Sequence, residues 1–128
     1  MTERAEQMLK ELYGKFSQGD MTGVLAMCTD DITFHVPCTT PLSGTYSKTT
    51  FPDLIGQVMT ISAGSFREEV VDIVANDQHA VAILDHFLER NGKQIYYRTD
   101  HIWQIRDGKC CGWLERPGDE GAFNDAWS

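Results

Sequence analysis

The stretch 94–117, QIYYRTDHIWQIRDGKCCGWLERP, constrains the fold of this chain more than any other part of it. Two segments rich in aromatic and β-branched residues flank Asp107-Gly108, and Asp-Gly between such segments is a strong β-hairpin signal. Asn76-Asp77 and Asn91-Gly92 separate similar segments upstream, and these residue pairs are typical of turns. We therefore expect four antiparallel strands, at about 65–76, 79–90, 94–106 and 109–116.

The first half of the chain has a helical pattern instead. Apolar residues recur at helical spacing over 3–17, which predicts an amphipathic helix, and Asp20 is a suitable N-cap for a short second helix. Residues 32–36 alternate apolar with polar and predict a strand, whereas 37–50 reads as a loop. A third helix is expected from Phe51 onward. Helices that precede most of the strands predict an α+β fold in one domain, residues 1–128, with the helices covering one face of a curved sheet.

Composition excludes several classes of function. The net charge is −8 with no cluster of basic residues, so we expect neither nucleic-acid binding nor docking on anionic membranes. The N-terminal sequence is charged and no apolar run approaches the length of a membrane span, which indicates a cytoplasmic protein.

The sequence carries no pattern that requires a cofactor or a metal. Its cysteines are Cys28, Cys38, Cys110 and Cys111, without a CxxC pair, and we expect them to be reduced and to pack as small apolar residues. The Ser/His/Asp order, the phosphate loop and the HExxH motif are also missing. We therefore expect no cofactor and no metal.

Four short motifs in order resemble the nuclear-transport-factor-2-like superfamily, and within it the SnoaL-like, ketosteroid-isomerase-related proteins. They are Gly19-Asp20, Asp30-Asp31, Pro41-Leu42-Ser43-Gly44 and Arg106-Asp107-Gly108-Lys109. The resemblance implies a cone-shaped α+β barrel, in which three N-terminal helices pack on a strongly curved, mostly antiparallel sheet around one cavity. It also implies a small-molecule ligand and a homodimer formed through the outer face of the sheet.

Ketosteroid isomerases match this chain at only one catalytic position. Asp100-His101-Ile102 is similar to their Asp-His-Phe motif, which implies that Asp100 hydrogen-bonds a substrate oxyanion. The position of their general base is Val36, which cannot move a proton, and the helix-1 tyrosine position falls on Leu12, one step from Tyr13. Steroid isomerisation is therefore disfavoured.

The limonene epoxide hydrolases, which share the fold, are matched even less. Glu115 stands near the position of their last-strand Asp, after Gly112-Trp113, but His86 and Leu88 replace their Arg and their other Asp. Their catalytic triad is not reproduced.

Strand parity and the resemblance disagree about the segment 94–106. The odd-numbered residues of this segment are the more apolar, so packing alone predicts that they face the core and that Arg98 and Asp100 face solvent. The resemblance implies the reverse, with Arg98 and Asp100 toward the cavity and the odd-numbered face toward a partner subunit. Both possibilities remain open at this point.

Two further ionisable residues are candidates for proton transfer. His86 lies among apolar neighbours, where a histidine is more often a satisfied core residue than a catalyst, yet its near-neutral pKa suits proton transfer. Glu115 is either an exposed charge near a strand end or a carboxyl beside Trp113 whose pKa is raised by desolvation.

The function we expect is a pocket for a modest apolar or cyclic molecule, with acid–base isomerisation, cyclisation or hydration. Asp100, Glu115 and His86 would be the catalytic residues, and Arg98 would steady the ligand. Five residues are expected to form apolar walls that bind the substrate: Tyr13, Phe16, Phe34, Val36 and Trp113. The alternative is a non-catalytic ligand-binding or dimerisation module.

Overall fold

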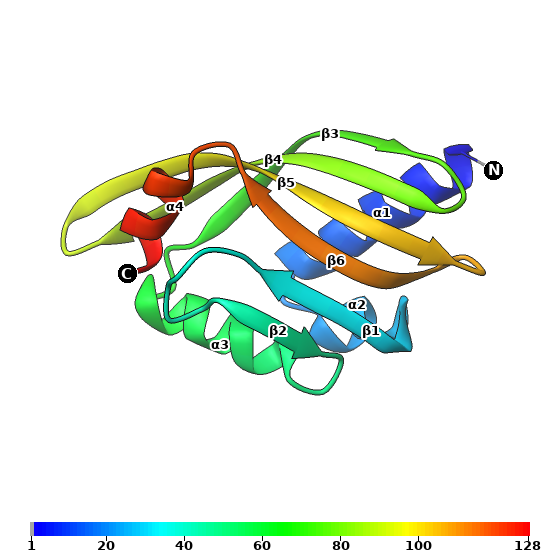
Figure 1. Ribbon diagram of the computed structural model, residues 1–128, viewed down its shortest axis with the longest axis horizontal. Coiled ribbons are helices and arrows are strands. Elements are labelled where there is room, and N and C mark those ends of the chain that lie inside the picture. Colours follow the sequence, from blue (N-terminus) through cyan, green and yellow to red (C-terminus); the bar gives the residue numbers. More distant parts are fainter. Residues whose placement is uncertain (1) are drawn as a thin grey trace.

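The computed structural model describes residues 2–128 and has the expected α+β organisation (Figure 1). Its elements follow the chain in the order α1 (Thr2–Ser17), α2 (Met21–Ala26), β1 (Cys28–Val36), β2 (Gly44–Ser47), α3 (Phe51–Ile61), β3 (Arg67–Ala75), β4 (His79–Arg90), β5 (Lys93–Arg106), β6 (Lys109–Pro117) and α4 (Glu120–Trp127). The three expected helices and the four strands after residue 65 are confirmed. Two elements were not expected: β2, inside the predicted loop 37–50, and α4, formed by the C-terminal residues.

The six strands form one open sheet in the order β2-β1-β6-β5-β4-β3. All neighbours pair antiparallel except β1 and β6, which run parallel. The sheet is twisted, and α1 and α3 lie on its concave side while α4 covers one end (Figure 1). The helices thus close a cone that the sheet leaves open, which is the predicted architecture.

Short turns hold the long strands in register. Asn91-Gly92 and Asp107-Gly108 have positive φ at both residues, between 52° and 78°, as two-residue hairpin loops of the favoured type require. The first joins β4 to β5, where His86 pairs with Tyr97, and the second joins β5 to β6. Because a strand's side chains alternate between faces, this register decides which polar residues meet inside the cone.

Capping and burial explain the helices. Asp20 accepts a hydrogen bond from the backbone N–H of Gly23, as predicted for the N-cap of α2. Asp119 caps α4 in the same way, through the N–H of Ala122. Phe123 and Trp127, on α4, are buried within the chain, so this helix packs back on the protein.

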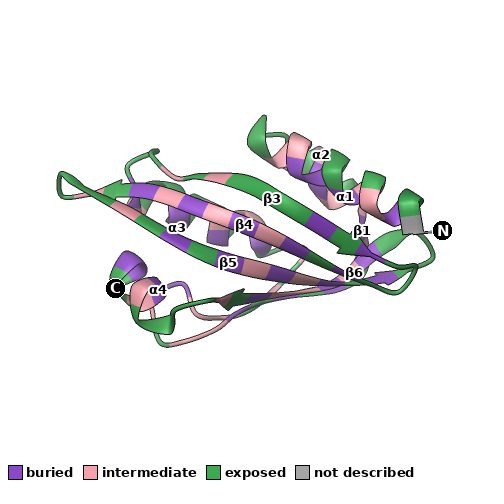
Figure 2. Cartoon of the chain, turned by 90° about the horizontal axis from the view of Figure 1, so that it is seen from above, coloured by how far each residue is buried: buried purple, intermediate pink, exposed green. Residues whose placement is uncertain are grey.

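Alternating burial settles the parity of β5 (Figure 2). Tyr97, Thr99, His101 and Trp103 are buried, whereas Arg98 is exposed and Asp100 is half-buried on the opposite face. The packing argument is correct, and the inward orientation of Asp100 and Arg98 implied by the resemblance is wrong. A shift of one residue along a strand exchanges the two faces, so a motif match at Asp100 instead of His101 inverts the whole strand.

Two further expectations from the sequence concern membrane spans and the cysteines. Among residues 2–128, no helix is long and apolar enough to cross a membrane. The four cysteines are free thiols, as expected.

Candidate functional site

A cavity of about 70 Å³ lies between the sheet and the four helices α1, α2, α3 and α4. Its walls are mostly aromatic and aliphatic, and five of the wall residues were predicted: Tyr13, Phe16, Phe34, Val36 and Trp113. The rings of Phe34 and Phe51 stack there with their centroids 4.0 Å apart. An apolar wall with a few polar groups is typical of small-molecule sites.

Three neighbouring strands place one polar row on this wall. His86 on β4 pairs in register with Glu68 on β3 and with Tyr97 on β5. Its Nε2 lies 2.8 Å from Oε2 of Glu68, and its Nδ1 lies 2.9 Å from the hydroxyl of Tyr97. Both ring nitrogens of His86 are therefore engaged.

A second polar row lies on β5 and β6. His101 pairs in register with Glu115. Nδ1 of His101 lies 2.7 Å from the hydroxyl of Tyr13, which also accepts a hydrogen bond of 3.0 Å from Nε1 of Trp103. Unlike His86, His101 has one ring nitrogen, Nε2, that is buried without a hydrogen-bond partner in the described part of the chain.

Glu115 joins the two rows electrostatically. Its Oε2 lies 3.8 Å from Nδ1 of His86, which is beyond hydrogen-bond distance but close enough for a charge interaction. This carboxyl oxygen has no hydrogen-bond partner within residues 2–128. The residue is 6% exposed. A carboxyl oxygen buried without a partner is costly unless a ligand, a proton or water satisfies it.

Burial and neighbouring charge move the pKa values of these groups in opposite directions. Burial raises the pKa of Glu115, an effect that the charge of His86 and the nearby hydroxyl of Thr99 partly offset. Burial alone would lower the pKa of His86, but the hydrogen bond to Glu68 and the surrounding carboxylates raise it above its ordinary value. Burial, together with the charge of His86, lowers the pKa of His101 well below its ordinary value. The site therefore favours a cationic His86, a neutral His101 and a carboxyl at Glu115 that keeps its proton to higher pH.

The tyrosines of the site resist ionisation. Burial raises the pKa of Tyr13 and of Tyr97 well above the ordinary value, and nearby carboxylates add to the effect. Both hydroxyls therefore remain protonated and act as hydrogen-bond donors and acceptors.

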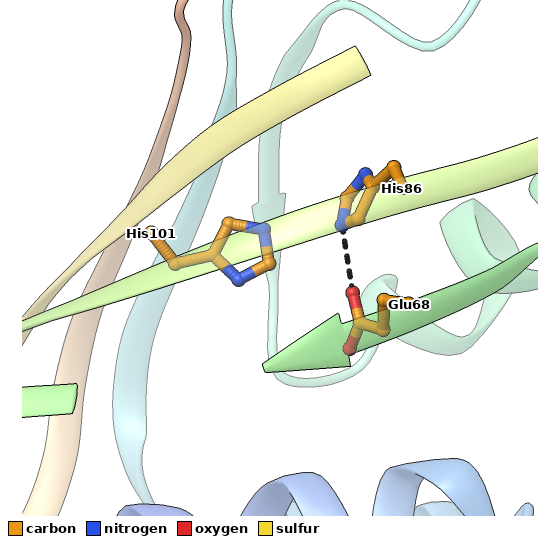
Figure 3. Close-up of side chains that lie close together, drawn as sticks. All are labelled: Glu68, His86 and His101. Carbon is orange, nitrogen blue, oxygen red and sulfur yellow. Dashed lines mark hydrogen bonds and ion pairs between the residues drawn. The ribbon is translucent and has the colours of Figure 1, made fainter. Parts of the chain in front are cut away.

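Glu68, His86 and His101 are the described residues that could hold a metal ion. One ligand atom from each lies within 4.8 Å of the others, and Figure 3 shows the three side chains, which come from the neighbouring strands β3, β4 and β5. The hydrogen bond between His86 and Glu68, drawn as a dashed line, occupies the two closest ligand atoms. A metal would have to displace the proton that these two atoms share.

The three predicted catalytic residues do not converge. His86 and Glu115 line the cavity, whereas Asp100 lies on the outer face of β5, where it pairs in register with Ile83 and Arg116. Arg98 is also outside the cavity and forms an ion pair with Asp85, with Nε 2.9 Å from Oδ1. The expectation that Arg98 contacts a ligand in the cavity is therefore wrong, for the same reason of parity.

A surface groove lies against the cavity and shares wall residues with it. Phe16, Ile55, Phe66 and Glu68 line both the groove and the cavity. These residues come from α1, α3 and the start of the strand segment, so they separate the cavity from the groove.

The sequence also matches known proteins. A family model described as the SnoaL-like domain matches residues 9–113. The chain belongs to the SnoaL-like domain family. Among curated proteins, none matches this SnoaL-like chain by sequence.

Solved structures confirm the fold. Bal32a, from a soil-derived mobile gene cassette, superposes on the SnoaL-like chain with a TM-score of 0.92 at 18% identity, over 99% of this chain and 98% of the other. TerC, co-crystallised with polyporic acid, gives 0.84 at 20% identity, over 96% and 97%. An NTF2-like protein of unknown function from Burkholderia pseudomallei K96243 gives 0.86 at 20% identity, over 98% of each chain. The family model confirms the predicted SnoaL-like family, while the solved structures, at identities this low, show the fold alone.

Sequence reasoning missed three polar residues of the SnoaL-like cavity: Glu68, Tyr97 and His101. Tyr97 and His101 lie on the odd-numbered face of β5, so the apolar parity of that segment was the available signal. Glu68 had no such signal, because β3 contains an irregularity between Val70 and Asp72 that breaks the alternation on which parity depends.

Proposed function

We propose that this protein binds a small cyclic molecule carrying a carbonyl or hydroxyl group in the cone and acts on it by acid–base chemistry. The observation that carries the proposal is the buried Oε2 of Glu115, unpaired within residues 2–128 and 3.8 Å from the ring of His86 inside an apolar cavity. Ionisable groups with strongly perturbed pKa values in such a cavity are typical of catalytic sites.

Glu115 is the proton carrier in this proposal. Burial makes it a carboxylic acid that can protonate a substrate oxygen or carbon, and the imidazolium of His86 then stabilises the carboxylate that remains. His86 does not itself abstract a proton, because Tyr97 and Glu68 engage both of its nitrogens. Isomerisation, cyclisation and hydration or dehydration all require this type of proton transfer.

Tryptophan fluorescence provides the binding assay. Trp103, Trp113 and Trp127 all line the cavity, and they are the chain's full complement of tryptophan. A library of cyclic ketones and phenols is screened for a change in emission, and hits are incubated with the protein and followed by NMR for turnover.

Two variants then separate catalysis from binding. Glu115→Gln keeps the shape of the side chain but cannot donate its proton, and we expect turnover to fall by about a hundredfold or more. Asp100→Asn is the matched control on the outer face, and we expect it to react like the wild type. Full turnover in Glu115→Gln would contradict the acid–base role.

The alternative function is non-catalytic binding, and one observation favours it. Both nitrogens of His86 are hydrogen-bonded within the protein, which is what a structural histidine shows. If hits bind, and the wild type and Glu115→Gln both leave every one of them unchanged, the protein is a binding module.

We also propose that two copies associate through the outer face of the sheet in the cytoplasm, where free thiols persist. Val81, Ile102 and Leu114 form a row in register across β4, β5 and β6 on this face. Val74, the register partner of Val81, and Tyr96, further along β5, are more than half exposed. Light scattering of the wild type should give a dimer, and Ile102→Lys should give a monomer. Gln7→Lys, on α1 at the other side of the sheet, is the control that leaves the dimer intact.

A further inference from the structure

Two parallel hydrogen-bonded chains of Trp, Tyr and His run along the cavity wall. In one, Nε1 of Trp127 donates to the hydroxyl of Tyr97, 2.8 Å away, and this hydroxyl lies 2.9 Å from Nδ1 of His86. In the other, Nε1 of Trp103 donates to the hydroxyl of Tyr13, which lies 2.7 Å from Nδ1 of His101. The chains differ at their histidines. Nε2 of His86 meets the carboxylate of Glu68, which favours a second proton on that ring, whereas Nε2 of His101 meets no partner within residues 2–128.

Counting donors assigns the proton of His101. An indole N–H can only donate, so the oxygen of Tyr13 accepts from Trp103. The hydroxyl hydrogen of Tyr13 then needs an acceptor, and Nδ1 of His101 is the acceptor within reach. Leaving this buried hydroxyl unpaired would cost about 1–3 kcal/mol of stability. Nδ1 of His101 is thus unprotonated.

A neutral imidazole with an unprotonated Nδ1 carries its hydrogen on Nε2. The environment of His101 favours the neutral form: the residue is 5% exposed, and the carboxylates of the site lie nearer to His86, which Glu68 and Glu115 approach to 2.8 and 3.8 Å. Nε2–H of His101 is therefore a donor whose nitrogen is buried, is unpaired within residues 2–128, and belongs to a residue of the cavity wall.

We propose that Nε2–H of His101 donates the hydrogen bond that holds an oxygen of the ligand, and that Tyr13 and Trp103 are positioning residues that keep the ring in this tautomer. The proposal rests on the proposed function, in that the cavity takes a ligand. It adds one requirement to that function: the ligand carries an acceptor oxygen where it meets His101, as in a ketone, a quinone or a phenolate.

Glu115 requires a second polar group on the ligand. Its backbone is the register partner of His101 on the neighbouring strand, and its unpaired Oε2 belongs to the same cavity wall. A ring that carries a carbonyl oxygen for His101 and a second oxygen for the carboxyl of Glu115 satisfies both groups. A hydrocarbon of the same shape leaves a donor and a carboxyl desolvated without partners, and this selects against it.

Nitrogen-15 NMR of histidine-labelled protein tests the tautomer without a ligand. We expect His101 to be neutral with its hydrogen on Nε2 at neutral pH. Tyr13→Phe removes the hydroxyl that donates to Nδ1, so the population of the Nε2–H tautomer should fall. A wild-type His101 with its hydrogen on Nδ1, or a cationic one, would overturn the assignment.

Acetophenone and ethylbenzene test the ligand contact, since they have similar shapes and only the ketone has an acceptor oxygen. We expect the wild type to prefer acetophenone by about three- to tenfold, as one hydrogen bond provides. Tyr13→Phe should reduce that preference and His101→Phe should abolish it while ethylbenzene still binds. An unchanged preference in His101→Phe would overturn the proposal. Failure of both probes to bind the wild type would instead contradict the proposed function, and the tautomer would still be decided by NMR.

Discussion

Nε2 of His86 lies 2.8 Å from Oε2 of Glu68, with their side chains 4% and 10% exposed. The pair joins adjacent strands and is flanked by Phe66, whose ring meets that of His86 edge-on at 4.9 Å. Because this charge pair is buried in an apolar wall, breaking it should change both the stability of the fold and the binding of any ligand that enters the cavity.

Glu68→Gln should lower the pKa of His86, because the carboxylate that stabilises the imidazolium is lost. The raised pKa of His86 in the folded state means that its proton stabilises the fold fully below its ordinary value of 6.5, and that this stabilisation is lost as pH rises through the folded pKa. The free energy of unfolding of Glu68→Gln should therefore lie furthest below the wild type just under pH 6.5 and approach it at higher pH. Proton NMR of the histidines and urea unfolding measure both effects.

Glu69→Gln is the matched control for that experiment. Glu69 is exposed and pairs with Arg67 on the surface, so its substitution should leave the titration of His86 in place. Equal titration curves for His86 in the wild type and Glu68→Gln would refute the assigned role of Glu68.

Glu115→Gln should become more stable relative to the wild type as pH rises. Burial raises the pKa of Glu115 above its ordinary value of 4.5, so the folded state holds this proton more tightly than the unfolded state does. The stabilisation is complete below pH 4.5 and is lost as pH increases through the folded pKa, and each pH unit between the unfolded and folded pKa values corresponds to about 1.4 kcal/mol. Glutamine does not ionise, so the variant does not lose stability in this pH range through this group. A difference in unfolding free energy that stays constant with pH would contradict the buried position of this carboxyl.

Tyr97→Phe should destabilise the protein by about 1–3 kcal/mol, because it leaves the indole N–H of Trp127 and Nδ1 of His86 buried without their partner. Tyr96→Phe is the control: this neighbour is 53% exposed and bonds Asp85 on the outer face, so we expect little change. Chemical unfolding compares the two. Equal effects of the two substitutions would show that the Trp127–Tyr97–His86 chain does not stabilise the fold.

Phe16→Ala should speed the association of a cavity ligand. Phe16 lines both the cavity and the neighbouring groove, so its truncation removes part of the wall that separates them. Stopped-flow tryptophan fluorescence with acetophenone should show a higher association rate than in the wild type. Phe34→Ala, in the closed part of the wall, should leave that rate unchanged but destabilise the fold by about 3–5 kcal/mol. An association rate that Phe16→Ala leaves unaltered would place the entrance elsewhere.

Local sequence was sufficient for most of the secondary structure and for the apolar walls. Asn91-Gly92 and Asp107-Gly108 adopt positive φ, which few residue pairs do readily, so each hairpin can be recognised from the pair alone. Phe34, Trp113 and their apolar neighbours could be assigned to the cavity because large aromatic side chains in strands usually face the buried side of the sheet. The element β2 could not be recognised, because four residues rich in Gly, Thr and Ser have little strand signal.

Polar residues were assigned less well, and the reason differs from one to the next. Asp100 and His101 are neighbours, so an error of one position in matching a motif places the wrong one inside. Glu68 and Glu69 are likewise adjacent, and the irregularity in β3 removes the alternation that would have distinguished them.

The sequence by itself determined that this chain forms helices followed by hairpins with an apolar interior, because turn chemistry and periodicity act over a few neighbouring residues. Only the tertiary structure decided that Glu68, His86, His101 and Glu115 line the cavity while Asp100 does not. A strand has two faces, and which of them is buried depends on register with other strands and on the helices that cover the sheet. Those contacts join residues far apart in the chain, so no local pattern contains them.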